Sequence, residues 1–373
     1  MLEVVQVNTC RQRRDFLRFP EKLYKGNSCY TPPLYMDERK IFRKDFIYND
    51  MCDAVYYNAY RDGKMVGRIS GIIQRASNAK NGEKRMRFCR FECLEDFEAA
   101  KALFEAVEAW ARAKGMDTAC GPLSFSDLER EGLLVGGYEF PATFEETWNP
   151  PYYGEYIEKL GYRKEVDWTG SRLRVPDEEG IEHLHQMADY VMRRYKLHLG
   201  QAKNTGDFIK KYADGIFELI DKSYDLLYGT VPFSPGMKKL MLDNFRLVVD
   251  IKNVAVILNE NDKMVCFGVA FPAIGDAVRK SMGHLTLGCI FRILKALRKP
   301  NVIDLCLVGV DPEWLNRGVS VIISAGLVDM LRRPGIEYAE TNMNLEENYA
   351  IQNQWKRFNE QKHKLHRSYV KEL

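Results

Sequence analysis

The residues VIDLCLVGV occupy positions 302–310 and lead through DPEWLNRGVS, at positions 311–320, into an apolar stretch that ends near Leu331. Nine consecutive residues rich in Val, Leu and Ile, closed by Asp311-Pro312, indicate a buried β-strand. From about Arg317 the apolar residues recur at helical spacing, which predicts a helix to Leu331. The stretch therefore predicts a strand–turn–helix unit with Gly318 in its turn, as expected of an α/β protein.

The residues around this unit continue the alternation of helices and strands. Before it lie two helical patterns, a hairpin and a basic, amphipathic helical region, predicted at 207–227, 236–245, 254–271 and 276–297. After it come a strand, a helix and a last strand, predicted at 337–345, 346–358 and 365–370.

The N-terminal part repeats this order. Strand patterns at 54–61 and 65–74 flank Asp62-Gly63, a strong hairpin turn signal, and a third strand is predicted at 86–93. A helix follows from Phe97, with Asp96 as its N-cap. Polar turn residues gather at 175–180, so we expect two domains, 1–176 and 177–373.

Composition limits the function. At 373 residues the chain is long enough for two cores, and 55 Lys and Arg against 52 Asp and Glu leave a net charge of only +3. We therefore expect neither nucleic acid nor a membrane as partner. The nine cysteines without a CxxC pair indicate reduced thiols, and the chain start lacks a signal-peptide pattern, so a cytoplasmic location is predicted.

Several separated motifs carry a family resemblance. The C-terminal order of elements resembles the N-acetyltransferase (GNAT) superfamily. The whole chain resembles a bacterial family of two tandem GNAT-like halves, through residues 16–24, 32–34, 66–69, 149–153 and 159–162. The resemblance implies two tandem α/β (α+β) folds, each a mixed, mostly antiparallel sheet flanked by helices.

The resemblance also implies acetyl-CoA or another acyl-CoA as co-substrate, without a metal. In GNAT enzymes the turn after the fourth strand directs backbone N–H groups at the CoA pyrophosphate. Leu315 and Ser320 depart from the usual pattern, while Gly318 is kept; alternatively, Gly318 only eases a tight turn. The implied cofactor-binding residues are Leu307, Val308, Val310, Asn316, Arg317, Gly318, Val319, Ser320 and Asn348.

The matching turn of the first half is Glu92-Cys93-Leu94-Glu95-Asp96. It has no glycine, and its three carboxylates would repel a pyrophosphate. We therefore expect the N-terminal half not to bind CoA.

Catalytic candidates come from two places. Side chains alternate between the two faces of a β-strand, so Glu340, Asn342 and Asn344 lie on one face of the predicted strand. Glu340 could there take a proton from an amine. Alternatively, this face of the strand is exposed to solvent, which would give the same pattern. GNAT enzymes often use a tyrosine seven residues after an Asn, as Tyr156 follows Asn149; alignment on Gly161 would instead put Ile157 at that position. After Asn348 that position is Trp355, which we expect in the core.

The sequence thus predicts an N-acyltransferase that moves an acyl group, expected to be acetyl, from acyl-CoA to a small-molecule amine by direct attack. A second hypothesis stays open: a non-catalytic GNAT-like protein that binds a ligand or partner. The six histidines match no nucleophile motif, and most are expected at the surface.

Overall fold

The computed structural model describes residues 1–373 except 226, 249 and 342. The contacts divide the chain into two compact units. Unit 1 comprises Met1–Thr169, Gly275–Arg292 and Lys364–Leu373, and unit 2 comprises Gly170–Ile274 and Ile293–His363. Two segments beyond residue 176, the expected end of the first domain, therefore belong to unit 1 with the N-terminal residues.

Unit 1 is built on a mostly antiparallel sheet in the order β1-β2-β3-β4-β5-β14, and β6 pairs with β14. Its elements are β1 (Leu2–Gln6), α1 (Cys10–Leu23), α2 (Tyr35–Glu38), η1 (Arg39–Phe42), β2 (Cys52–Arg61), β3 (Lys64–Gln74), α3 (Arg75–Asn81), β4 (Arg85–Cys93), α4 (Phe97–Ala113), β5 (Thr118–Gly121), β6 (Leu133–Gly136), α5 (Tyr152–Lys159), the first part of β7 (Arg163–Arg174), α9 (Gly275–Arg279), the first part of α10 (Leu287–Arg298), and β14 (Asn359–Glu372) from residue 364.

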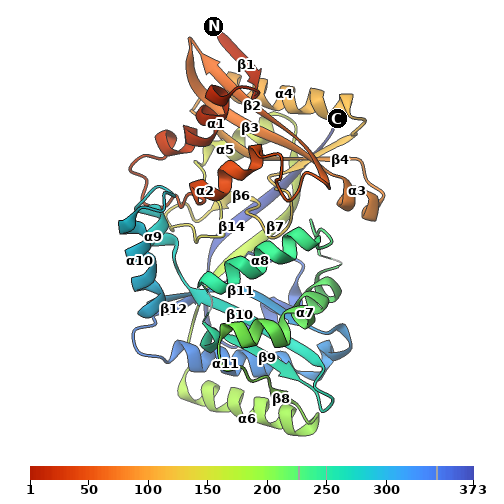
Figure 1. Cartoon of the computed structure of the whole chain (residues 1–373), viewed down its shortest axis with the longest axis vertical. Helices are drawn as coiled ribbons and strands as arrows, with labels where there is room; N and C mark the ends of the chain where they lie inside the picture. The colour runs from red at the N-terminus through yellow and green to blue at the C-terminus, as the bar shows by residue number, and fades with distance from the viewer. Residues whose placement is uncertain (226, 249, 342) are drawn as a thin grey trace. The chain divides into compact units, whose positions relative to one another are not determined.

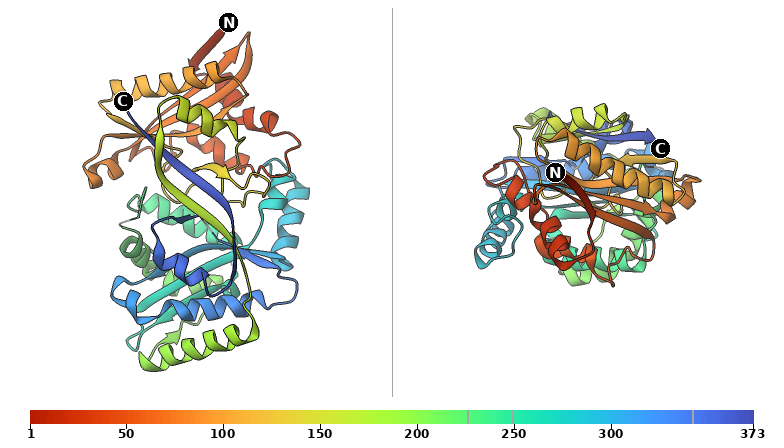
Figure 2. Two further views of the ribbon diagram at one scale, coloured as in Figure 1. Left: turned by 180° about the vertical axis from the view of Figure 1, so that it is seen from behind. Right: turned by 90° about the horizontal axis from the view of Figure 1, so that it is seen from above.

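Helices cover both faces of this sheet. The helix α4 lies across β2 and β3 (Figures 1 and 2) and buries Leu103, Phe104 and Val107 against them. As predicted, the Asp96 carboxylate caps α4 by accepting from the Ala99 amide at 3.1 Å. On the other face α1 buries Phe16 beside Tyr56. A continuous apolar core on the α4 side therefore holds unit 1 together.

Unit 2 has a sheet in the order β12-β11-β10-β9-β8, with the end of β7 beside β12. Its other elements are α6 (Glu178–Arg194), β8 (His198–Leu199), α7 (Thr205–Tyr224), α8 (Pro235–Val248), η2 (Ile251–Asn253), β9 (Val254–Leu258), β10 (Met264–Pro272), β11 (Val302–Val310), η3 (Pro312–Arg317), α11 (Ser320–Leu331), β12 (Tyr338–Glu340), β13 (Asn344–Leu345) and α12 (Tyr349–Trp355).

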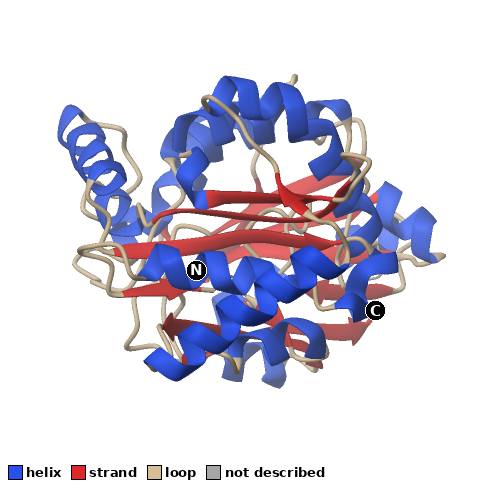
Figure 3. Ribbon diagram, turned by 90° about the horizontal axis from the view of Figure 1, so that it is seen from below, coloured by secondary structure: helices blue, strands red, loops and turns tan. Residues whose placement is uncertain are grey.

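Two cores flank the sheet of unit 2, and Figure 3 shows the helices on either side of the strands. The helices α6 and α11 pack against each other (Figure 1) and cover one face, where Trp355 and Phe358 join the core. The helices α7 and α8 cover the other face. The buried Trp355 confirms its expected place in the core.

The two units share one local arrangement. In unit 1 the parallel strands β4 and β5 pair over three residues, from Arg85↔Thr118 to Arg87↔Cys120. In unit 2 the parallel strands β11 and β12 also pair over three residues, ending at Asp304↔Glu340. Both β4 and β11 also contain a register shift against the preceding strand. The expected repeat of two α/β folds with mixed, mostly antiparallel sheets is therefore confirmed.

Several elements differ from the sequence predictions. The strands β1 and β7 were not predicted. The helix predicted from Arg317 begins at Ser320, because residues 312–317 form a 3₁₀ turn that ends in the left-handed Gly318. The helical region predicted at 276–297 is two helices, α9 and α10, with Gly283 between them at φ +77°.

All nine cysteines are free, and most are buried, as expected. Within the described part of the chain, no helix has the length and apolar character needed to cross a membrane.

Candidate functional site

The central feature of unit 2 is the point where β11 and β12 part. Beyond Asp304↔Glu340 the strand β11 continues without β12, and the side chains of Leu305–Val308 are only half-buried. The register shift against β10 falls here, because Val269 lies opposite Leu307 and Ala270 lies opposite Leu305. The predicted residues Leu307, Val308 and Val310 lie on this segment, and the Val308 carbonyl accepts from the Tyr224 hydroxyl at 3.0 Å.

The turn after β11 presents backbone donors. Gly318 has φ +72°, which favours glycine, and α11 begins two residues later. Among the described residues, no acceptor binds the amide N–H groups of Gly318, Val319 and Ser320. Three unpaired donors at the positive end of a twelve-residue helix make a site suited to an anion.

The side chains of the turn differ in exposure. Asn316 and Arg317 are exposed, while Val319 is buried and anchors the start of α11. The Arg317 guanidinium lies over the Trp314 ring at 4.5 Å from its centroid. The guanidinium also lies 5.8 Å from the centroid of the Tyr195 ring, so it packs on two aromatic rings.

Glu340 lies in a buried charged cluster at the point of strand divergence. Its side chain is 6% exposed; Oε1 accepts from Arg172 Nε at 3.0 Å, and Oε2 lies 3.1 Å from Nε2 of His363. Asp304, its buried register partner on β11, adds a second carboxylate. Since Glu340 is buried and ion-paired, it does not belong to a solvent-facing strand.

The other residues predicted near Glu340 have structural contacts. Asn344 Oδ1 accepts from the indole Nε1 of Trp355 at 2.6 Å, and Asn348 caps α12 by accepting from the Ile351 amide at 3.2 Å. Asn342 lies outside the described residues. The strand predicted at 337–345 is two short strands, β12 and β13.

In unit 1 the corresponding edge of β4 is closed. The Tyr152 and Tyr153 hydroxyls donate to the Cys93 carbonyl at 2.8 and 3.0 Å, and the Cys93 amide donates to the Tyr153 oxygen at 2.6 Å. Asp96, at the start of α4, is held by Arg61. Protein groups therefore bind both the carbonyl and the amide of the last residue of β4.

Tyr156, the remaining catalytic candidate, lies on α5 of unit 1. It is buried, with its ring 5.2 Å from those of Phe97 and Tyr152. It is therefore part of the aromatic packing between α4 and α5.

Sequence reasoning did not identify a buried carboxyl group at the end of β4. Burial raises the pKa of Glu92 to about 7, although Arg68 lies 3.5 Å away and the Tyr24 hydroxyl binds it. Both of these side chains are themselves buried. Perturbed carboxyl groups of this kind often mark functional sites.

This pKa predicts a pH dependence of stability. Between pH 4.5 and 7 the folded protein keeps a proton on Glu92 that the unfolded chain releases, so the free energy of unfolding falls as the pH rises. A shift of this size corresponds to about 3 kcal/mol. In urea unfolding at pH 5 and pH 8, Glu92→Gln should lack this part of the decline, whereas the exposed Glu95→Gln should keep it. Equal declines in all three proteins would contradict the assignment.

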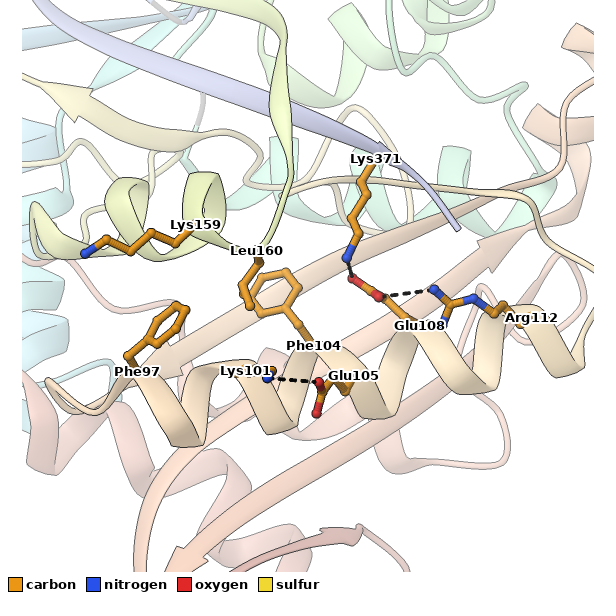
Figure 4. A pocket seen from close by; sticks show the side chains of 9 residues that line it. All are labelled: Phe97, Lys101, Phe104, Glu105, Glu108, Arg112, Lys159, Leu160 and Lys371. Atoms are coloured by element: carbon orange, nitrogen blue, oxygen red, sulfur yellow. Dashed lines mark hydrogen bonds and ion pairs between the residues drawn. The ribbon is translucent and has the colours of Figure 1, made fainter.

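A polar groove of about 430 Å³ lies beside α4 and α5 of unit 1 (Figure 4). Glu108 points into it and accepts from Tyr162 and Lys371 at 3.0 and 2.8 Å, and Arg112 lies 3.5 Å away. The lining residues are Phe97, Lys101, Phe104, Glu105, Glu108, Arg112, Lys159, Leu160 and Lys371. Its buried carboxylate is neutralised within the unit, so the groove has a structural explanation.

The sequence analysis also missed Arg172 and His363. His363 has a side chain only 1% exposed, and His366 is fully buried, so both differ from the expected surface position. The other four histidines are exposed or half-exposed, as predicted. The predicted strand at 365–370 begins two residues after His363, so the sequence did not indicate its burial.

Comparison with known proteins gives two curated relatives. Protein YghO of Escherichia coli K12 is 25% identical over 368 residues, which cover 96% of this chain and 92% of that protein. Bacterial ceramide synthase of Caulobacter vibrioides is 26% identical over 291 residues, which cover 76% of this chain and 73% of that protein. No protein-family model matches the chain.

Solved structures resemble the whole chain. A tandem GNAT protein from the clavulanic acid biosynthesis pathway has a TM-score of 0.57 at 12% identity and covers 100% of this chain and 98% of its own. A GCN5-related N-acetyltransferase from Sphaerobacter thermophilus has a TM-score of 0.50 at 10% identity, and the match covers 100% of this chain and 95% of that protein. Together with the repeated arrangement of β4–β5 and β11–β12, these similarities show that the chain has the GNAT superfamily fold with tandem domains.

Proposed function

We propose that this protein is an acyl-CoA-dependent N-acyltransferase whose acyl donor binds in unit 2. The observation that carries the proposal is the open segment of β11 followed by three unpaired amides at the start of α11. The half-buried Leu305–Val308 would lie along the pantetheine chain, and the amides of 318–320 would hold the pyrophosphate. The proposal uses unit 2 because the turn of unit 1 carries three acidic residues and its Cys93 carbonyl is bound by Tyr152 and Tyr153.

The buried cluster supplies acid–base groups for the reaction. The amine nitrogen would attack the thioester carbonyl, the C–N bond would form as the C–S bond breaks, and CoA would leave as the thiol. In this proposal Glu340 takes the proton that the amine loses, and His363, 3.1 Å away, passes a proton to the departing thiolate. Arg172 would be a positioning residue, because its bond to Oε1 fixes the carboxylate.

The relatives suggest a class of acceptor. Bacterial ceramide synthase is named for a product that joins a fatty acyl group to a long-chain amine through an amide. The same bond type would arise here, so both acetyl-CoA and long-chain acyl-CoA should be tested with short and long-chain amines.

Thiol release and calorimetry test the proposal. Release of free thiol from acyl-CoA should depend on added amine, and the acyl-CoA should bind with measurable heat. If neither acetyl-CoA nor long-chain acyl-CoA binds at high protein concentration, the enzyme proposal fails and a non-catalytic ligand-binding role is favoured.

Replacing Glu340 tests the catalytic role. Glu340→Gln should lower kcat by about 10²-fold or more, with acyl-CoA affinity changed only slightly. The matched control Glu337→Gln alters an exposed carboxylate just before β12 and should leave kcat unchanged. A Glu340→Gln protein that binds acyl-CoA and turns over at the normal rate would overturn the assignment.

A further inference from the structure

The helix α10 (Leu287–Arg298) carries an unusual exposed surface. Leu287 is 87% exposed and Phe291 is 70% exposed, and Ile290 and Leu294 lie on the same stripe at spacings of three and four residues. Leu285, just before the helix, is also exposed. Five large apolar side chains therefore face solvent at one place.

The opposite face of α10 is fixed to its own surroundings. Cys289 is fully buried, and its thiol contacts the Ala277 carbonyl at 3.6 Å. Arg292 is bound to the Ser281 hydroxyl. The exposed stripe is therefore the outer face of a well-anchored helix, which Figures 1 and 2 draw in teal after α9.

The charges along this segment have one sign. Residues 277–303 contain no Asp or Glu. They contain Arg279, Lys280, Arg292, Lys295, Arg298 and Lys299. Asp276 pairs with the first two of these, but no acidic side chain in the described residues pairs with Lys295, Arg298 or Lys299. Three uncompensated cations thus lie beside the apolar stripe.

We infer that α10 is an interfacial helix that binds the surface of an anionic lipid membrane. An apolar stripe with Leu and Phe next to Lys and Arg is the pattern of helices that lie in the headgroup region. Twelve residues at 1.5 Å each are too short to cross the hydrocarbon core, so the helix lies on the surface. This inference differs from the sequence-based expectation that the protein has no membrane partner. It stands apart from the proposed acyl transfer.

Vesicle sedimentation of the full chain tests the inference. The protein should sediment with phosphatidylcholine vesicles that contain phosphatidylglycerol at least about tenfold more than with phosphatidylcholine alone. Leu287→Ser/Phe291→Ser should abolish sedimentation. Lys295→Gln/Lys299→Gln should remove the preference for the anionic vesicles.

A variant with two exposed apolar side chains removed elsewhere serves as the control. Tyr190→Ser/Leu199→Ser removes two other exposed apolar side chains and should leave vesicle binding unchanged. Absence of binding to anionic vesicles would overturn the inference. So would a dimer in solution that Leu287→Ser/Phe291→Ser dissociates, because the stripe would then be an interface between two copies.

Discussion

Replacing Lys364 with methionine should destabilise unit 1 by about 3–5 kcal/mol, the usual effect of removing one partner from a buried ion pair. Lys364 and Glu146 form such a pair, and both side chains are only 1% exposed. Burial by itself raises the pKa of Glu146, but Lys364 and His366 outweigh it and hold the pKa below its ordinary value. Without Lys364 the carboxylate would keep the hydrogen bond from the Thr143 amide, at 2.9 Å, and the electrostatic effect of His366.

Urea unfolding of three further variants separates the pair from its surroundings. Glu146→Gln should destabilise by a similar amount, because it leaves the ammonium group unpaired. The double variant Glu146→Gln/Lys364→Met should recover most of the loss. Lys239→Met removes an exposed lysine paired with Asp243 and should change stability by less than about 1 kcal/mol. Single variants as stable as the parent would show that the pair is not the stabilising contact.

The second large effect concerns acyl-CoA binding at Gly318. Asn and Asp have nearly the same shape, and both tolerate the left-handed backbone seen here at φ +72°. Gly318→Asn should bind acyl-CoA much as the parent does. Gly318→Asp places a negative charge beside the unpaired amides of 318–320, so it should weaken binding at least about tenfold, or 1.4 kcal/mol.

The stabilities of Gly318→Asn and Gly318→Asp serve as the control for their affinities. A carboxylate near the N-terminus of α11 interacts favourably with the helix dipole, so Gly318→Asp should unfold no more easily than Gly318→Asn. Calorimetry with acyl-CoA gives the affinity, and thermal unfolding gives the stability. Equal affinities for the two variants would remove the turn from the proposed donor site while leaving the GNAT fold unaffected.

The local elements of this protein could be predicted because their signals are local. The Asp62-Gly63 turn predicts the hairpin of β2 and β3, and Asp96 predicts the start of α4. The residues 302–310 predict β11, and Gly318 predicts the turn that follows it. Backbone sterics, caps and side-chain periodicity act within one or two turns of chain, so the sequence carries them directly.

The predicted sites needed more than local information. Leu315 and Ser320 depart from the expected turn. The amides of 318–320 nevertheless depend on backbone geometry, and no acceptor in the described part of the chain binds them. The acidic turn of the first half predicted a unit without CoA; the structure adds Tyr152 and Tyr153 on Cys93, a feature that charge counting could not reveal. Which backbone groups stay unpaired, and which side chains bind the others, depends on how distant segments pack.

The sequence by itself determined the alternation of helices and strands, the repeat of two α/β folds and the turn at Gly318. Only the tertiary structure decided that segments 275–292 and 364–373 complete unit 1, and that Glu340 meets Arg172 and His363. Arg172 precedes Glu340 by 168 residues. Which strands pair at that distance depends on the burial of whole faces and on the strand order of the sheet, and no local pattern of residues encodes either.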